Sequence, residues 1–289
     1  MNGLSFADFW DLFWPSLTAS LLASVLCGAL GVFVVLRRVA FVSAALGQVS
    51  GLGVALGFLV GSLFGVDPHE QTPLYLDPVV LALLLTGALS TVLSVTGRAQ
   101  RTSPESAVAF SYLVAAALAL VALASPRIVQ EAHEVNDLLF GSTVAVRQEH
   151  LVELAVVTVL ALLGGAFYFQ DLVFVSFDRE MARTVGLPVA RLEAGLNLAI
   201  GVSVAVATRA VGALPVFGFL VLPAGAALIG SERMGRLAWL AAAISATSAL
   251  AGFYLSYVEN WPTGPMMVLC AAASWPLAWG TRQLTGRAR

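Results

Sequence analysis

The stretch from Arg37 to Gly61 has no charged side chain after Arg38. The uncharged run is more than twenty residues long, which is enough to cross the hydrocarbon core of a bilayer as one helix. The whole chain follows the same trend, since 59% of its 289 residues are hydrophobic and 11% are charged, against about 25% in soluble domains. The sequence therefore predicts an all-α, polytopic integral membrane protein.

Glycines recur four residues apart in this stretch, as Gly47 with Gly51 and as Gly53, Gly57 and Gly61. On a helix, this spacing leaves a groove without side chains, in which neighbouring helices can pack closely. We therefore expect the helix to lie at the centre of the fold.

The same stretch carries three polar side chains, Ser43, Gln48 and Ser50. An amide in hydrocarbon is costly unless a neighbour, water or a substrate satisfies it, so the three residues are candidates for a pathway wall. The alternative is open, because serines are common in membrane helices and Gln48 can bond to a neighbouring helix.

Arginines cluster in alternate turns between the apolar segments, and twelve of the fifteen fall on one side. By the positive-inside rule, that side is the cytoplasm, so the N-terminus is expected outside and the C-terminus inside. Nine spans result, or eight if the segment after Arg209 does not cross fully, and residues 1–289 form a single transmembrane domain. The eight spans besides the glycine-rich one are expected near residues 13–36, 79–96, 104–124, 151–169, 192–208, 211–230, 237–257 and 266–279.

Helix-breaking residues interrupt the segment at 211–230, namely Gly212, Pro215, Gly218, Pro223 and Gly225. We expect this helix to be kinked or broken, as transporter helices are where the backbone faces a cavity. A kink that serves only packing is the alternative.

Residues between the fifth and sixth spans have the parts of a short surface helix. Asp178 is placed as the N-cap, Glu180 lies in the first turn, Arg183 in the last, and Gly186 just past the end. A compact helix on the cytoplasmic face suits docking to a partner protein. A connector that lies on lipid headgroups, with Arg179 and Arg183 near phosphates, remains the alternative.

The sequence lacks the residues that several kinds of enzyme and binding site require. All fifteen basic residues are arginine, whereas a Walker-type phosphate loop needs a lysine. No HExxH, CxxC or GxSxG motif is present, and Cys27 and Cys270 lie in apolar runs, where they act as small hydrophobic residues. The sequence thus predicts neither an enzyme nor an ATP-binding site, and ion-coupled secondary transport would need ionisable residues inside the spans.

Six blocks stand in the order and spacing found in the permeases of ABC importers for zinc, manganese and iron, the ABC-3 family. They are RRVAFVSAALGQVSGLGVALG, SPESAVAFSYL, NDLLFGSTVAV, SFDREMARTVGLPV, VGALPVFGFLVLPAGAAL and TGPMMVLCAA. The chain resembles that family over nearly its whole length. The resemblance implies a permease homodimer in the bacterial cytoplasmic (inner) membrane, two cytoplasmic ATPase subunits that hold the ATP, and an external substrate-binding protein. It implies no cofactor in this chain and no nucleic-acid partner.

The resemblance also assigns roles to two segments. Phe177 to Gly186 match the segment that couples such permeases to the ATPase. On the second helix the family usually carries an aspartate and, four residues later, a histidine, whereas this chain has Ala44 and Gln48. Three explanations compete: other groups such as Gln48 and Ser43 pass the metal with water, the substrate is not a free divalent cation, or transport is lost, which leaves a membrane scaffold or accessory subunit. We favour a divergent metal importer with unknown metal ligands.

Overall fold

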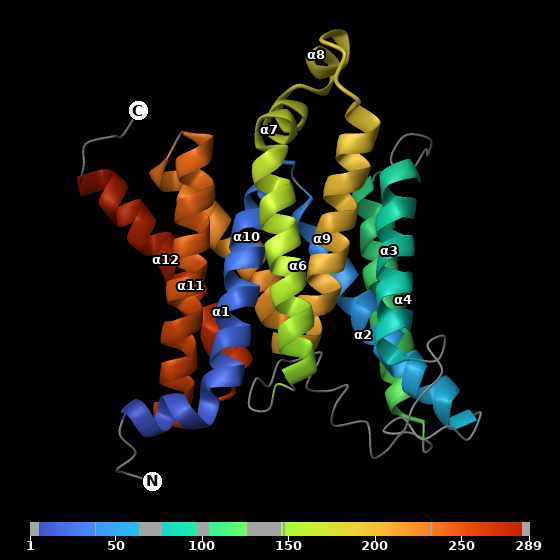
Figure 1. Ribbon diagram of the computed structural model, residues 1–289, viewed down its shortest axis with the longest axis vertical. Coiled ribbons are helices and arrows are strands. Elements are labelled where there is room, and N and C mark those ends of the chain that lie inside the picture. Colours follow the sequence, from blue (N-terminus) through green and yellow to red (C-terminus); the bar gives the residue numbers. More distant parts are fainter. Residues whose placement is uncertain are drawn as a thin grey trace.

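The computed structural model describes residues 6–37, 39–63, 77–96, 104–125, 146, 148–231 and 233–284. The described residues form eleven helices and no strand, and nine of the helices have 18 residues or more. These nine run alternately up and down the molecule (Figure 1), in the order of the nine predicted spans. They are α1 (Phe6–Leu36), α2 (Ala40–Leu63), α3 (Pro78–Thr96), α4 (Pro104–Leu123), α6 (Gln148–Phe167), α9 (Val189–Val211), α10 (Ala213–Gly230), α11 (Met234–Glu259) and α12 (Thr263–Leu284).

Two short helices, α7 (Phe169–Phe177) and α8 (Arg179–Thr184), stand together at one end of this bundle, between α6 and α9 (Figure 1). Among the described residues, seven of the long helices are apolar enough over their length to cross a membrane, and α3 adds a shorter apolar helix over Pro78–Val92. The prediction of an all-α polytopic membrane protein is confirmed, with nine as an approximate helix count.

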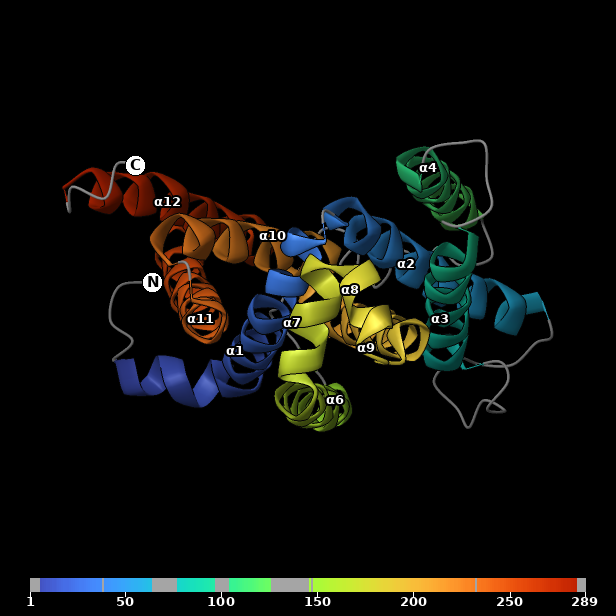
Figure 2. The ribbon, with the colours of Figure 1, turned by 90° about the horizontal axis from the view of Figure 1, so that it is seen from above.

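Helix α1 packs against α6, α9, α10 and α11, and its apolar side chains join the largest buried cluster of the described residues. Leu26 of α1 and Phe219 and Leu220 of α10 are among the largest side chains that are fully buried there. Seen from above (Figure 2), α2 passes between α10 and α9 on one side and α3 and α4 on the other.

The glycine spacing of α2 has the consequence that the sequence predicts. All five glycines are buried, and a Cβ added at Gly53 or Gly57 would collide with the α3 backbone at Ala82 or Pro78. The two helices can approach this closely only because both positions lack a side chain. The glycines therefore fix α2 against α3.

Of the five residues expected to kink or break the segment at 211–230, one lies in the turn between two helices. Gly212, with a φ of 92°, separates α9 from α10. An L side chain is strained at such an angle, so a glycine is favoured where the chain turns back. The α10 helix then continues without interruption from Ala213 to Gly230 through Pro215, Gly218, Pro223 and Gly225.

Local geometry accounts for three of the four residues, Pro215, Gly218 and Gly225. Pro215 lies in the first turn, where its missing N–H has no helical partner to lose. A Cβ at Gly218 would crowd Val268 of α12, and one at Gly225 would collide with the Trp275 ring. The two glycines therefore serve the packing of α12 on α10. Trp275 also donates a hydrogen bond from Nε1 to the Leu222 carbonyl, at 2.8 Å.

Candidate functional site

The α8 helix begins as its sequence predicts. Asp178 has extended backbone angles, and its Oδ1 accepts a hydrogen bond from the Met181 amide at 2.9 Å. An N-cap of this kind satisfies one of the amides that a helix start leaves unpaired. Arg183 pairs with Glu180 one turn earlier, at 2.9 Å, on the solvent side.

The end of α8 is closed by a pair of hydrogen bonds. Gly186 has a φ of 90°, its amide donates to the Arg183 carbonyl, and the Leu187 amide donates to the Ala182 carbonyl, both at 3.0 Å. This pairing is the Schellman motif, which favours glycine in the left-handed position. Six residues are too few for a stable isolated helix, so the caps at both ends hold α8 in shape.

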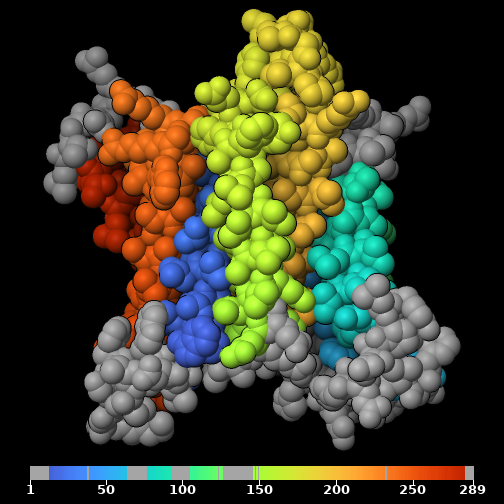
Figure 3. All heavy atoms as spheres, viewed as in Figure 1, coloured from blue at the N-terminus to red at the C-terminus, as the bar shows by residue number. Residues whose placement is uncertain are grey.

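One face of α8 is packed and the other is open. Ala182 is buried against Val175 of α7 and Val189 of α9, so the helix is seated on its neighbours. Its tip projects beyond the rest of the bundle (Figures 1 and 3). Three large apolar side chains on and beside α8 are exposed, Phe177, Met181 and Val185. Apolar side chains gathered at a projecting tip are typical of a protein contact surface.

An ion cluster lies beneath α8 that sequence reasoning missed. The Glu193 carboxylate on α9 contacts the guanidinium groups of Arg37, at 3.2 Å, and Arg179. We call these three residues the Glu193 cluster. Burial lowers the pKa of Arg37 from its ordinary value, and the charge of Glu193 opposes that shift. A sequence signal existed, because Glu193 is the one acidic residue in the mostly apolar α9.

The four predicted pathway residues of α2 do not share one surface. Ser43 and Ser50 are buried towards α9, where Ser50 Oγ lies 3.5 Å from the Ala205 carbonyl oxygen. Ala44 and Gln48 are half-buried and lie about 100 to 140° further round the helix from Ser43. The structure therefore separates an inner pair, Ser43 and Ser50, from an outer pair, Ala44 and Gln48.

A small cavity of about 80 Å³ lies beside Ser43, near the first residue of α2. Its polar lining comes from Ser43 of α2, Ser90 of α3 and Asn197 of α9. The Ser90 hydroxyl donates to the Asn197 carbonyl at 2.7 Å, and Arg37 donates to the Asn197 side-chain oxygen at 3.2 Å. In the part of the chain that the structure describes, no three side chains of His, Cys, Asp or Glu are grouped to hold a metal ion.

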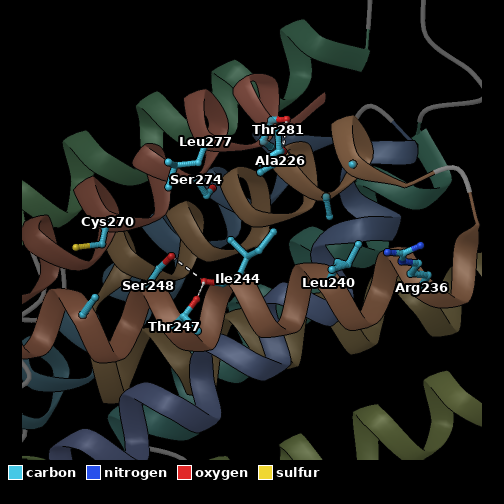
Figure 4. A pocket seen from close by; sticks show the side chains of 14 residues that line it. Ala226, Arg236, Leu240, Ile244, Thr247, Ser248, Cys270, Ser274, Leu277 and Thr281 are labelled. Atoms are coloured by element: carbon cyan, nitrogen blue, oxygen red, sulfur yellow. Dashed lines mark hydrogen bonds between the residues drawn. The ribbon is translucent and has the colours of Figure 1, made fainter. Parts of the chain in front are cut away.

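A larger hollow of about 520 Å³ lies between α10, α11 and α12, away from the predicted pathway. Figure 4 shows its apolar wall and the single cationic side chain at one end, Arg236. Hydroxyls line it too, and that of Ser248 donates back to the Ile244 carbonyl of its own helix at 2.7 Å. None of the predicted pathway or coupling residues lines this hollow.

The far end of α9 carries a second ion pair. Arg209 donates to Glu153 of α6 at 2.9 Å, and its other guanidinium nitrogen lies 2.9 Å from His150 Nδ1. Since a guanidinium can only donate, His150 must be unprotonated at Nδ1 in this contact. The pair ties α9 to α6 at the end opposite to α8.

Comparison with known proteins agrees with this architecture. A family model described as the ABC 3 transport family matches residues 10–278. The chain is 26% identical over 263 residues to the manganese transport system membrane protein MntC of Halalkalibacterium halodurans, covering 91% of this chain and 85% of that protein. It is also 26% identical over 263 residues to the high-affinity zinc uptake system membrane protein ZnuB of Haemophilus influenzae, covering 91% of this chain and 95% of that one.

A solved structure has the same fold. The structure titled PsaBC from Streptococcus pneumoniae in complex with Fab matches with a TM-score of 0.78 and 22% identity, covering 95% of this chain and 94% of that one. The family model spans nearly the whole chain, and its match is independent of this structural likeness. This protein therefore belongs to the ABC 3 transport family.

Proposed function

We propose that this chain is the permease subunit of an ATP-binding-cassette importer that moves a divalent metal ion across the bacterial cytoplasmic membrane. The observation that carries the proposal is α8, a doubly capped helix that projects from the bundle and exposes Phe177, Met181 and Val185. A rigid, partly apolar helix of this kind offers a docking element for a separate ATPase, on which ATP would be hydrolysed. Relatives named for manganese and zinc transport support the substrate class.

The orientation follows from charge. Among the described arginines, Arg209 alone lies at the end of the bundle opposite to α8. The others lie at the α8 end, and they are Arg37, Arg179, Arg183, Arg191, Arg233, Arg236 and Arg282. By the positive-inside rule, we place α8 in the cytoplasm, with the N-terminus outside and the C-terminus inside.

The outer pair of α2, Ala44 and Gln48, marks the face that we propose for the metal pathway. This face is only half-buried within one chain, and a second copy packed against it would enclose the path. An amide oxygen is a ligand that suits manganese, whereas zinc favours imidazole or thiolate groups. A pathway that carries Gln48 and no imidazole at this turn therefore favours manganese over zinc.

The test is uptake by the complete assembly. The permease, its partner ATPase and the external binding protein are reconstituted in proteoliposomes with radioactive manganese or zinc outside and ATP inside. We expect ATP-dependent uptake of manganese that exceeds that of zinc. Assembly with an active ATPase but no uptake of either metal would instead support the non-transporting scaffold.

A further inference from the structure

Glu193 joins two segments that are far apart in the chain. Arg37 follows the last residue of α1, and Arg179 is the first residue of α8, yet both guanidinium groups contact Glu193 Oε1. The turn between α1 and α2 is thereby tied to α8 through a single carboxylate. Since Glu193 is on α9, it also anchors both segments to the bundle.

The contacts continue from Arg37 towards the pathway helix. Its second terminal nitrogen donates to the Asn197 side chain, one turn further along α9. Asn197 in turn accepts the Ser90 hydroxyl through its carbonyl oxygen, and both residues line the small cavity beside Ser43 of α2. A set of polar contacts thus runs from α8 through Glu193 and Arg37 to Asn197 and Ser90, at the cavity that Ser43 of α2 also lines.

The two halves of the Glu193 cluster differ in burial. The side chains of Arg37 and Glu193 are 12% and 7% exposed, whereas that of Arg179 is 46% exposed. The buried half is costly to separate, because either group alone would leave a buried charge without its partner. The Arg179 half is partly hydrated and can separate at much lower cost.

We infer that Glu193 is a positioning residue for energy coupling, which transmits a displacement of α8 to the turn between α1 and α2. When α8 moves, Arg179 either draws the Glu193 carboxylate with it or separates from it. Either event changes the ion pair between Glu193 and Arg37. Arg37 is held to the cavity through Asn197, so the change reaches the base of α2. The inference rests on the proposed function, in which α8 is moved by an ATPase.

The first experiment needs neither substrate nor ATPase. Hydrogen exchange of the isolated permease in lipid nanodiscs is followed over residues 35–42, in the parent and in Arg179→Gln. We expect the exchange rate of these amides to rise about five-fold or more in the variant. Five-fold is the lower end of the effect that one site typically has on a distant one. Arg183→Gln is the matched control, since Arg183 lies on the same helix and pairs with Glu180 on the exposed side. The control should match the parent.

The second experiment uses the complete complex. Arg179→Gln should lose at least about five-fold of the stimulation of ATP hydrolysis by substrate, expressed relative to its own rate without substrate. Arg179→Lys, which keeps a cation beside Glu193, should retain most of this stimulation, whereas a merely structural role would give the two variants the same loss. Glu193→Gln should uncouple as Arg179→Gln does, if it folds.

The outcomes separate the two proposals. Unchanged exchange over residues 35–42 in Arg179→Gln, or equal effects of Arg179→Gln and Arg183→Gln, overturns the inference. Quickened exchange in a permease whose parent complex moves no metal contradicts the proposed function and supports the linkage. Loss of stimulation in Arg179→Gln alone, with its exchange effect, supports both.

Discussion

Glu193 and Arg209 lie near the two ends of α9, about 24 Å apart along its axis, and both side chains are almost completely buried in ion pairs. Each pair ties α9 to different helices, α1 and α8 at one end and α6 at the other. The apolar body between them carries no other charge, so these two anchors set the position of α9 across the membrane.

Arg209→Ala should lower the free energy of unfolding by about 1–3 kcal/mol, because it removes charge-assisted hydrogen bonds to two side chains. The loss is moderated because Glu153 remains 44% exposed and can be hydrated. Thermal unfolding of the purified permease in detergent measures the change. Arg191→Ala, at an exposed position of the same helix, is the control and should unfold like the parent. Equal stability of the two variants would contradict the anchoring role.

Gly186→Pro should abolish substrate-stimulated ATP turnover while leaving the bundle folded. Proline fixes φ near −65°, whereas Gly186 has a φ of 90°, and proline also lacks the amide that donates to Arg183. The end of α8 must therefore be rebuilt, without any change in the apolar core. Stimulated turnover and thermal unfolding are compared with those of Gly235→Ala, where an added Cβ meets nothing within 4 Å. Normal stimulation in the proline variant would remove α8 from the coupling pathway.

Glu180→Lys provides a second test of the same surface through charge alone. It replaces the exposed partner of Arg183 with a cation and places that cation in the first turn of α8, where the helix dipole disfavours it. We expect stimulated ATP turnover to fall while insertion and folding of the permease persist. Assays of ATP hydrolysis with and without substrate measure the effect, and a variant that behaves as the parent would argue against docking at this face.

Ala44→Asp combined with Gln48→His should be tolerated and should increase the binding of divalent metal. A carboxylate at the centre of a membrane helix costs about 2.5–3.5 kcal/mol unless it faces water or a cation, and the outer pair is only half-buried. The two new side chains would lie one turn apart and form two ligands. Ser50→Asp is the control, because that position is fully buried against α9 and should be destabilised.

Thermal unfolding of the double variant and of Ser50→Asp is measured with and without manganese or zinc. A metal-dependent rise in stability of the double variant is expected. If the double variant is as unstable as Ser50→Asp, or gains nothing with either metal, the outer pair does not face a metal path.

Membrane orientation can be tested by thiol labelling. A cysteine in place of Glu259, at the end of α11, should react with an impermeant reagent added outside, and one in place of Thr184, on α8, should react only after the membrane is opened. Both positions are exposed, and Cys27 is buried, so background labelling comes chiefly from Cys270, which is first replaced by alanine. The reverse pattern would invert the orientation.

Sequence patterns within short segments predict much of the fold. Apolar length located all nine long helices, and capping residues located α8 with its N-cap Asp178 and its terminal Gly186. Both features depend on residues within a few positions of one another. Gly212 lies in the turn between α9 and α10, whereas Gly218 and Gly225 face α12, and no local pattern separates a glycine that turns the chain from one that admits a neighbour.

The long-range features required the structure. Arg37, Arg179 and Glu193 lie in separate segments, and their meeting depends on how α1, α8 and α9 pack. The four candidate pathway residues lie within α2. Their division into an inner and an outer pair depends on which neighbours cover each face, and sequence spacing alone does not supply that information.

The close seating of Gly53 and Gly57 on the α3 backbone has a mechanical consequence. With no side chain between them at these positions, the two helices pack backbone against backbone, so we expect α2 and α3 to move together. On its other side, α2 meets α10 more loosely, with a Cβ at Gly47 3.5 Å from the Ala213 side chain, and the cavity beside Ser43 leaves further clearance. We therefore expect α2 to shift more readily against α10 than against α3.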